Sequence, residues 1–301
     1  MKKIVFFVVL LTTVFCIISF PCSALSKPNI SAKSACLYDV DNACFIINKE
    51  MNMRLPMAST TKIMTALIAI EECELNKLIS VPREAVGIEG SSVYLKEGDL
   101  ITVKDLIYSV LLQSANDAAT ALAIYISGDT RTFSDLMNKR AREIGLSDTS
   151  FENPHGLDSE SHYTTAHDLA LLAACAIKND VFLQISSTYK YEFNIDEAPR
   201  VLVNHNKLIR AYSGTFGIKT GYTKKSGRCL VSYASRNGKN LICVTLNDPN
   251  DWNDHKNMLD YGFNLSQLAN TNNSNFIADM ANEETQLWKK SDYKNLLQIR
   301  V

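Results

Sequence analysis

Three kinds of site are missing from this 301-residue sequence. None of its eight cysteines belongs to a C-x-x-C pair, which disfavours a structural zinc site. His155 and His162 flank a glycine-containing loop, but no third ligand stands at a sensible spacing, so loop packing is a better interpretation than metal binding. No stripe of basic residues occurs, and the formal net charge is only −1. We therefore expect no metal, no cofactor and no nucleic-acid partner.

The first 24 residues have the layout of an export signal. Lys2 and Lys3 precede an apolar run over 4–20, Pro21 interrupts it, and small residues follow up to Ala24. This pattern predicts a secretory signal peptide, residues 1–24, with cleavage after Ala24. Because the run also has the length of a marginal membrane span, an uncleaved anchor stays an alternative. In both cases the protein is expected outside the cytoplasm.

Six cysteines follow that leader. Cys36 and Cys44 flank a predicted hairpin turn, where they could face each other and form a disulfide in an exported protein; free thiols are the alternative. The other four stand in apolar helical or strand-like stretches, which favours core thiols: Cys73, Cys175, Cys229 and Cys243.

Strand patterns at both ends of the chain enclose a largely helical middle. Residues 60–180 show mostly helical spacing, and a last helix is expected over 254–268. Strands are predicted in a hairpin at 35–48 and at 189–195, 227–234 and 240–246. We therefore predict one α+β domain, residues 25–268. Its antiparallel sheet is built from N- and C-terminal strands, with helices on its faces and a helical insertion.

Local signals set the ends of several helices. Thr102, Thr132 and Thr165 each precede an aspartate by three residues, which predicts capping boxes, and Gly145 predicts the end of the second of these helices. The polar tail, residues 269–301, contains a modestly amphipathic piece. That piece predicts a short helix packed on the domain; peripheral association with a membrane surface is the alternative.

Ser59-Thr60-Thr61-Lys62 places a hydroxyl and an amine one helical turn apart. A loop with Pro56 leads into this helix, so Ser59 is expected at the helix N-terminus, where backbone N–H groups and the helix dipole favour an oxyanion. Lys62 stands in an otherwise apolar stretch, and burial would lower its pKa enough for it to act as a base. Ser59 and Lys62 are therefore candidate catalytic residues; a helix cap and a solvated lysine are the plainer interpretation.

Two further motifs follow along the chain. Ser114-Ala115-Asn116 lies between two predicted helices, where the hydroxyl could relay a proton and the amide could bind a substrate amide. A simple helix connection is the alternative. Lys219-Thr220-Gly221 is typical of a strand in which the lysine and threonine hold a carboxylate and Gly221 lets a substrate backbone approach. A hairpin with an exposed lysine is the alternative there. The order of the three motifs favours a single acyl-transfer site.

The motifs and their flanks resemble the D-alanyl-D-alanine carboxypeptidases, the low-molecular-mass serine penicillin-binding proteins of bacteria. The similarity covers about residues 30–264. It is densest in four segments: Pro56–Thr65, Asn153–Leu157, His162–Asp168 and Gly217–Thr223. The resemblance implies a β-lactamase/transpeptidase-like fold. It also implies removal of D-Ala from peptidoglycan stem peptides ending in D-Ala-D-Ala, with β-lactam antibiotics as covalent inhibitors.

By the same resemblance, each motif receives a role. Ser59 would form the acyl-enzyme, Lys62 would accept its proton, and Ser114 would assist proton transfer. The substrate's backbone and terminal carboxylate would be held by Asn116, Lys219 and Thr220. The backbone N–H groups of Ser59 and Tyr222 would form the oxyanion hole.

The sequence departs from the family pattern in its C-terminal part and at two positions near the third motif. Many relatives carry a further β-rich domain and an amphipathic C-terminal anchor. The residues after Asn264 are too few for such a domain, which weakens the inference of membrane attachment through the C-terminus. Tyr222 and Ser226 stand where other members have His and Ala, and are expected to tune substrate fit.

Two other functions stay open. A β-lactamase is one alternative, with Glu152 as the group that positions the deacylating water. A catalytically inactive wall-binding protein of the same fold is the other.

Overall fold

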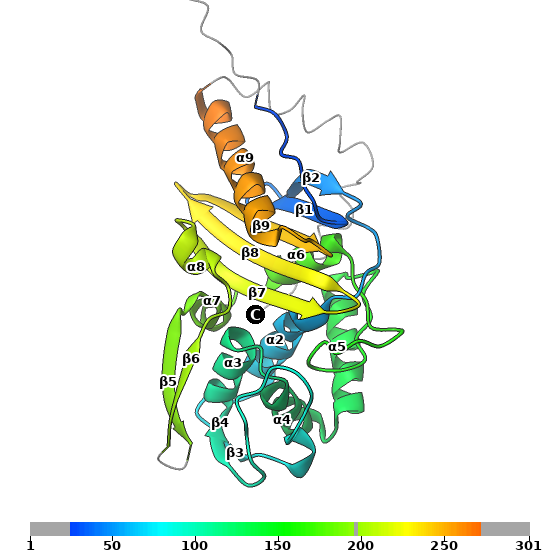
Figure 1. Ribbon diagram of the computed structural model, residues 1–301, viewed down its shortest axis with the longest axis vertical. Coiled ribbons are helices and arrows are strands. Elements are labelled where there is room, and N and C mark those ends of the chain that lie inside the picture. The colour runs from blue at the N-terminus through cyan, green and yellow to red at the C-terminus, as the bar shows by residue number, and fades with distance from the viewer. Residues whose placement is uncertain (1–24, 196–197, 272–301) are drawn as a thin grey trace, which may run out of the picture.

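The two ends of the chain meet in one antiparallel sheet. The computed structural model describes residues 25–195 and 198–271, and within them five strands pair in the order β2-β1-β9-β8-β7 (Figure 1). Strand β1 pairs with β9 from Ser34 opposite Leu246 to Asp39 opposite Leu241. The predicted sheet built from both termini is therefore confirmed. Its strands are β1 (Ser34–Asp39), β2 (Cys44–Lys49), β7 (Thr215–Thr223), β8 (Gly227–Arg236) and β9 (Lys239–Leu246).

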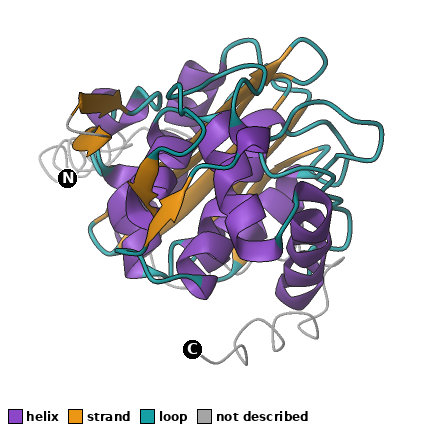
Figure 2. Ribbon diagram, turned by 90° about the horizontal axis from the view of Figure 1, so that it is seen from below, coloured by secondary structure: helices purple, strands orange, loops and turns teal. Residues whose placement is uncertain are grey.

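Helices cover both faces of this sheet, as Figure 2 shows. On one face lie α9 (Asp251–Thr271) and the short α8 (Leu208–Ala211), which enclose the smaller of two cores. On the other face lie α2 (Lys62–Glu72), α6 (Ala166–Ala176) and α7 (Asp180–Ser187), whose buried residues belong to the larger core. The last helix begins three residues before its predicted start. The predicted leader and nearly all of the predicted tail lie outside the described residues.

Both faces of the central strands are apolar because both are covered. Successive side chains of a strand point to opposite faces, and neighbours along β8 and β9 accordingly belong to different cores. Leu230 and Cys243 pack in the smaller core, whereas Val231 and Val244 pack in the larger one. This explains why these strands show apolar runs instead of strict alternation in the sequence.

The helical insertion lies between β2 and β7 and forms the lower part of the molecule in Figure 1. Besides α2, α6 and α7 it contains the helices α3 (Val103–Leu112), α4 (Asn116–Ser127) and α5 (Thr130–Ile144), and the 3-10 turns η1 (Ala58–Thr61) and η2 (Arg83–Ala85). Two small sheets complete it: β3 (Leu78–Ser80) with β4 (Leu100–Thr102), and β5 (Lys190–Ile195) with β6 (Ala198–Val203).

A membrane-crossing helix was sought within the described part of the chain. No single helix there combines sufficient length with sufficient apolar character. Helices α6 and α7 pass the test together by length and composition, but they are bent by 109° at their junction.

Helix caps explain where three of these helices begin. Thr102 and Thr165 accept hydrogen bonds from the backbone N–H groups of Asp105 and Asp168, as predicted. The predicted start at Thr132 is wrong, because Asp129 is the N-cap and its carboxylate accepts the Thr132 N–H at 2.7 Å. Gly145 ends that helix in the left-handed conformation at φ +89°, as expected of a glycine C-cap.

Cys36 and Cys44 do not face each other across the β1–β2 hairpin. Cys36 stands opposite Asn48, and Cys44 stands opposite Asp39 at the other end of the pairing. The expected disulfide alternative is therefore contradicted by the register. All six cysteines of the described chain are free, and burial raises the pKa of Cys36 and Cys229, which suits core thiols.

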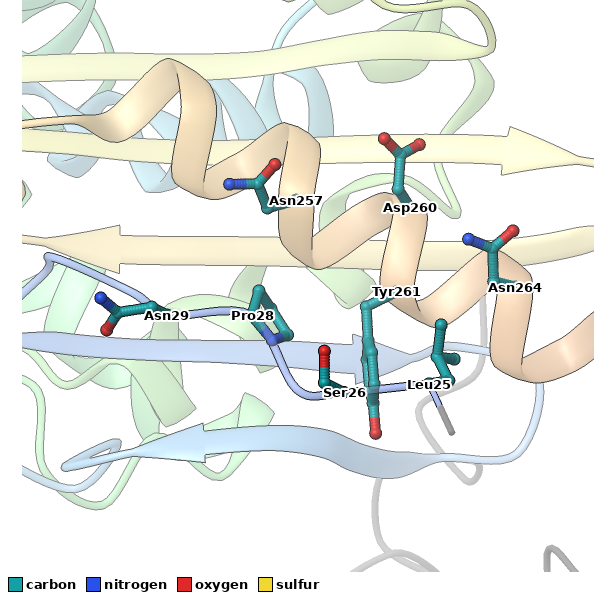
Figure 3. A pocket seen from close by; sticks show the side chains of 8 residues that line it. All are labelled: Leu25, Ser26, Pro28, Asn29, Asn257, Asp260, Tyr261 and Asn264. Carbon is teal, nitrogen blue, oxygen red and sulfur yellow. The ribbon is translucent and has the colours of Figure 1, made fainter. Parts of the chain in front are cut away.

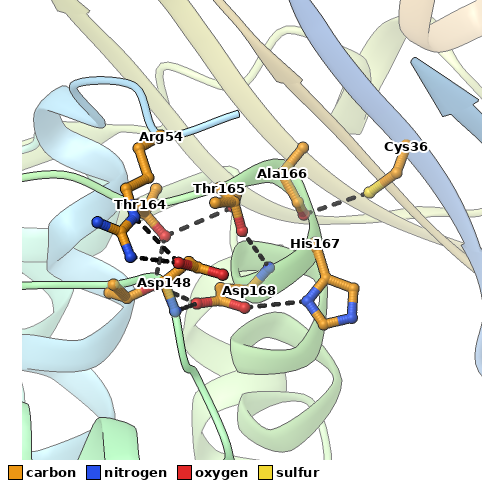
Figure 4. A network of polar contacts seen from close by, with 9 residues as sticks. Cys36, Arg54, Asp148, Thr164, Thr165, Ala166, His167 and Asp168 are labelled. Carbon is orange, nitrogen blue, oxygen red and sulfur yellow. Dashed lines mark hydrogen bonds and ion pairs between the residues drawn. The ribbon is translucent and has the colours of Figure 1, made fainter. Parts of the chain in front are cut away.

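A buried carboxylate at the start of α6 fixes the segment that leads to the site (Figure 4). Asp168 accepts hydrogen bonds at 2.8 Å from the backbone N–H of Asp148 and from the hydroxyl of Thr149. Its other oxygen lies 2.9 Å from Nδ1 of His167. Arg54 pairs with Asp148 at 2.6 Å. These contacts tie both ends of residues 148–168 together, and the loop between them reaches the Ser59 turn.

Candidate active site

Ser59 lies in a 3-10 turn that leads directly into α2. The turn spans Ala58–Thr61, and Ala58 has φ +46°, a left-handed conformation that is strained for a residue with a Cβ. Thr60, Thr61 and Lys62 are fully buried, whereas Ser59 keeps part of its surface exposed. The strained residue before Ser59 turns the chain so that this one hydroxyl faces outward from a buried segment.

Lys62 is fully buried beneath Ser59 and is surrounded by oxygen atoms. Its Nζ lies 3.0 Å from Ser59 Oγ, 2.6 Å from Asn116 Oδ1 and 2.5 Å from the backbone oxygen of His155. Burial lowers its pKa well below the ordinary value, and the charge of Lys219 lowers it further, although Asp117 opposes both. A neutral amine can donate its two hydrogens to the two carbonyl oxygens. Its lone pair is then left for the Ser59 hydroxyl.

Asn116 begins α4 and is held by the loop between η2 and β4. Its Nδ2 donates to the Glu89 backbone oxygen at 2.5 Å, and its backbone N–H donates to the Ser91 oxygen at 2.7 Å. The side chain is therefore fixed by contacts on both of its polar atoms. Ser114 lies two residues earlier, nearly buried and at φ +61°, in the short connection between α3 and α4.

Lys219, Thr220 and Gly221 lie on β7, the edge strand that passes the Ser59 turn. Lys219 is 1% exposed, and its Nζ donates to the Thr220 backbone oxygen at 3.0 Å. Burial lowers its pKa to about 7. Lys219 is therefore mostly cationic below about pH 7.

Gly221 lies against the Ser59 turn. A Cβ at this position would lie 3.1 Å from the backbone N of Ser59 and 3.2 Å from the oxygen of Met57. The missing side chain therefore allows β7 to approach the Ser59 turn. Tyr222, the next residue, is 66% exposed at the edge of the same strand.

The loop of residues 153–157 belongs to the site through its backbone, and its side chains did not predict this. Its His155 carbonyl binds Lys62, and its Pro154 carbonyl accepts the Thr65 hydroxyl at 2.6 Å. Gly156 has φ +90°, and a Cβ there would lie 1.9 Å from the oxygen of Ala58. The family-like segment Asn153–Leu157 was the available sequence signal, but backbone carbonyls carry no signature in residue identity.

Both loop histidines use their ring nitrogens in hydrogen bonds within the protein. His155 Nδ1 accepts the Leu157 N–H at 3.3 Å, and His162 Nδ1 accepts the Glu152 N–H at 3.0 Å. Burial, with a smaller effect from Lys62, lowers the pKa of His155 to about 3 and that of His162 to about 4. Both rings are therefore neutral at neutral pH and pack in the loop.

A separate pocket lies on the α9 face of the sheet (Figure 3). It opens between the chain at Leu25–Asn29 and α9, where Asn257, Asp260, Tyr261 and Asn264 contribute to its wall. None of the three motifs lines it. The chemistry of the site thus belongs to the opposite side, where η1, α4 and β7 meet.

This fold and this arrangement define the class of serine acyl-transfer enzymes that use a lysine in place of a histidine base. A family model described as D-alanyl-D-alanine carboxypeptidase matches residues 22–250. The chain belongs to this peptidase family.

Individual relatives support the same placement. DacF of Bacillus subtilis (strain 168), a D-alanyl-D-alanine carboxypeptidase, is 37% identical over 241 residues, which cover 77% of this chain and 62% of DacF. DacB2 of Mycobacterium tuberculosis, which has the same description, is 31% identical over 257 residues, covering 83% and 88%. The chain therefore spans less than two thirds of the length of DacF.

Solved structures share the fold. The D-alanyl-D-alanine carboxypeptidase from Mycobacterium tuberculosis H37Rv superposes with a TM-score of 0.76 at 30% identity, over 81% of this chain and 95% of that chain. The DD-transpeptidase of Streptomyces K15 gives a TM-score of 0.75 at 30% identity, over 79% and 99%. The expected transpeptidase-like α+β fold is confirmed.

Proposed function

We propose that this protein is a serine D-Ala-D-Ala carboxypeptidase that removes the terminal D-Ala from peptidoglycan stem pentapeptides. The observation that carries the proposal is the surroundings of Lys62 Nζ. Two carbonyl oxygens, from Asn116 and His155, accept its hydrogens, and the Ser59 hydroxyl lies within 3.0 Å. A serine so placed has a proton acceptor of its own, and family membership supplies the substrate class.

The reaction follows from this geometry in two halves. Ser59 Oγ attacks the carbonyl carbon of the penultimate D-Ala while Lys62 takes the hydroxyl proton. The bond to the terminal D-Ala nitrogen breaks, and the leaving amine receives that proton from Lys62 through the Ser114 hydroxyl. Water then attacks the ester, Lys62 again takes a proton, and the proton returns to Ser59 as the shortened peptide leaves.

The transition-state oxyanion and the substrate carboxylate have separate partners. The Ser59 N–H, beside β7, and the Tyr222 N–H supply the oxyanion hole. The cation of Lys219, together with the Thr220 hydroxyl, holds the terminal carboxylate, and Asn116 contacts the substrate backbone. A β-lactam has a carboxylate and a strained amide in the corresponding places, so we expect it to acylate Ser59 and remain bound.

The leader pattern of residues 1–24 supports a location outside the cytoplasmic membrane, where peptidoglycan stem peptides are found. Together with the substrate class, this pattern makes an exported protein part of the proposal. Mass spectrometry of the mature protein from its host checks it: a chain that begins at Leu25 is expected, and a retained Met1 would show an anchor instead.

A β-lactamase is disfavoured by the position of Glu152. The side chain is exposed, and its carboxylate accepts the hydroxyl of Ser159 at the surface. Only its backbone N–H takes part in the buried loop, through His162. The carboxylate therefore does not position a water molecule beside Ser59.

The proposal is tested by release of D-alanine from a synthetic pentapeptide ending in D-Ala-D-Ala. We expect catalytic release from this peptide and much slower reaction of the same peptide with a C-terminal amide. Rapid turnover of benzylpenicillin without D-alanine release would show a β-lactamase. If the protein neither releases D-alanine nor forms a covalent penicillin adduct, it is an inactive protein of the same fold.

Replacing Lys219 by methionine is expected to raise KM for the pentapeptide about 10- to 100-fold, which corresponds to one charge-assisted hydrogen bond to a carboxylate. Since the pKa of Lys219 lies near 7, the cation is present below pH 7 and is lost above it. The wild-type KM should therefore rise as pH increases through about 7, and this rise should vanish in Lys219→Met. An unchanged KM in a variant that melts normally would contradict the assignment.

A further inference from the structure

Contacts to the Ala58 carbonyl oxygen set the orientation of the peptide unit that joins Ala58 to Ser59. A peptide unit is planar, so the Ala58 carbonyl and the Ser59 N–H have a fixed relative orientation. Ala58 is also strained at φ +46°. Whatever holds the Ala58 oxygen therefore decides where the Ser59 N–H points.

Three hydrogen bonds run in one direction toward that oxygen. The Glu152 backbone N–H donates to His162 Nδ1 at 3.0 Å, which leaves the ring proton on Nε2. Nε2 lies 2.7 Å from the Thr61 hydroxyl oxygen and donates to it. The Thr61 hydroxyl in turn donates to the Ala58 oxygen at 2.8 Å. His162 and Thr61 thus each accept one hydrogen bond and donate the next.

The two hydrogen bonds nearest the Ala58 oxygen are buried. Thr61 is fully buried and His162 is 3% exposed. Hydrogen bonds in a medium of low dielectric constant are electrostatically stronger than in water, and linked bonds polarise one another. A bond donated to the Ala58 carbonyl draws electron density from the amide, so the Ser59 N–H becomes a better donor.

Two glycines hold the same peptide unit from opposite ends. A Cβ at Gly156 would lie 1.9 Å from the Ala58 oxygen, and a Cβ at Gly221 would lie 3.1 Å from the Ser59 nitrogen. Backbone from the 153–157 loop and from β7 therefore packs directly on the unit. Packing restricts its position, while the hydrogen-bond chain sets its polarity.

We propose that His162 is a positioning residue for the oxyanion hole: through Thr61 it orients and polarises the Ala58–Ser59 peptide so that the Ser59 N–H faces the developing oxyanion. The inference rests on the proposed function, because an oxyanion forms only if Ser59 is acylated. It gives a role to a histidine that the reaction itself does not use as acid or base.

Thr61→Val removes the hydroxyl link at nearly constant volume. Stopped-flow acylation by a fluorescent penicillin separates the dissociation constant of the first complex from the acylation rate constant. Loss of an oxyanion-hole donor costs about 100- to 1,000-fold. Because the donor is weakened here and not removed, we expect the rate constant to fall about 10- to 100-fold with little change in the dissociation constant. Thr61→Ser, which keeps the hydroxyl, should restore most of the rate.

Thr245→Val is the matched control. Thr245 and His255 form a second fully buried threonine–histidine pair, 3.1 Å apart, beneath α9. Its loss should lower the melting temperature but leave the acylation rate constant unchanged. His162→Ala provides a second test of the chain if Thr61→Val does not fold.

The outcomes separate the two proposals. A folded Thr61→Val or His162→Ala variant that is acylated at the wild-type rate would overturn the positioning role. So would a Thr61→Ser variant as slow as Thr61→Val, or an equal rate loss in Thr245→Val. Failure of the wild-type protein to be acylated at all would instead overturn the proposed function.

Discussion

Replacing Lys62 by methionine is expected to slow acylation by a penicillin about 1,000-fold, within the range for loss of a general base. Methionine has a similar length but no proton acceptor, so the Ser59 hydroxyl would have to be deprotonated by water. The measurement is the acylation rate constant of the purified variant. Because the substitution leaves the Asn116 and His155 oxygens without this donor, the melting temperature should also fall, so the rate constant is measured at a temperature where the variant is folded.

The pH dependence of the wild-type rate carries the same information. Burial and Lys219 both lower the pKa of Lys62, so the base is neutral over more of the pH range than a surface lysine. Acylation should weaken as pH falls through this lowered pKa, because protonation occupies the lone pair. Lys49→Met is the matched control, since Lys49 donates to the Ile30 oxygen far from the site. A Lys62→Met rate close to that of Lys49→Met would rule out Lys62 as the base.

Alanine at Gly156 is expected to cost more activity than any comparable glycine substitution. Its Cβ would lie 1.9 Å from the Ala58 oxygen and 2.9 Å from the Ser59 nitrogen, and both are backbone atoms that cannot rotate away. The loop must move, and it would take the His155 carbonyl away from Lys62. We expect an acylation rate about 100-fold lower, comparable to loss of one oxyanion-hole donor, measured with the same penicillin.

Gly98→Ala separates this effect from backbone strain. Gly98 has φ +87°, close to the +90° of Gly156, but a Cβ there meets nothing within 4 Å. Both variants pay the strain of a left-handed alanine, about 1–3 kcal/mol. Both variants should therefore lose stability, but only Gly156→Ala should also be acylated more slowly. Equal acylation rates in the two variants would refute a role for the 153–157 loop in shaping the site.

The sequence predicted those features of the fold that depend on residues close together in the chain. Thr102 and Thr165 cap their helices because the interacting groups are three residues apart. The same rule failed at Thr132, where Asp129 offers a carboxylate one turn earlier and takes the capping position. Competition between two adjacent caps is decided by packing of the whole helix, which a three-residue pattern does not contain.

The sequence did not predict the strand register or the close contacts between segments that are far apart in the chain. Whether Cys36 faces Cys44 depends on the pairing of β1 with β2, and a bulge between Leu37 and Tyr38 shifts that register. The contact of Gly221 with the Ser59 turn exists only because two segments far apart in the sequence fold together. Side-chain motifs identified Ser59 and Lys62, whereas the carbonyl of His155 became visible only in the structure.

The most direct measurement of the central claim is the intact mass of the protein after treatment with benzylpenicillin. For the wild-type chain we predict a gain of one penicillin molecule, and for a folded Ser59→Ala variant no gain. Labelling that persists in Ser59→Ala would contradict the assignment of Ser59 as the nucleophile, and a wild-type protein of unchanged mass would contradict the acyl-enzyme itself.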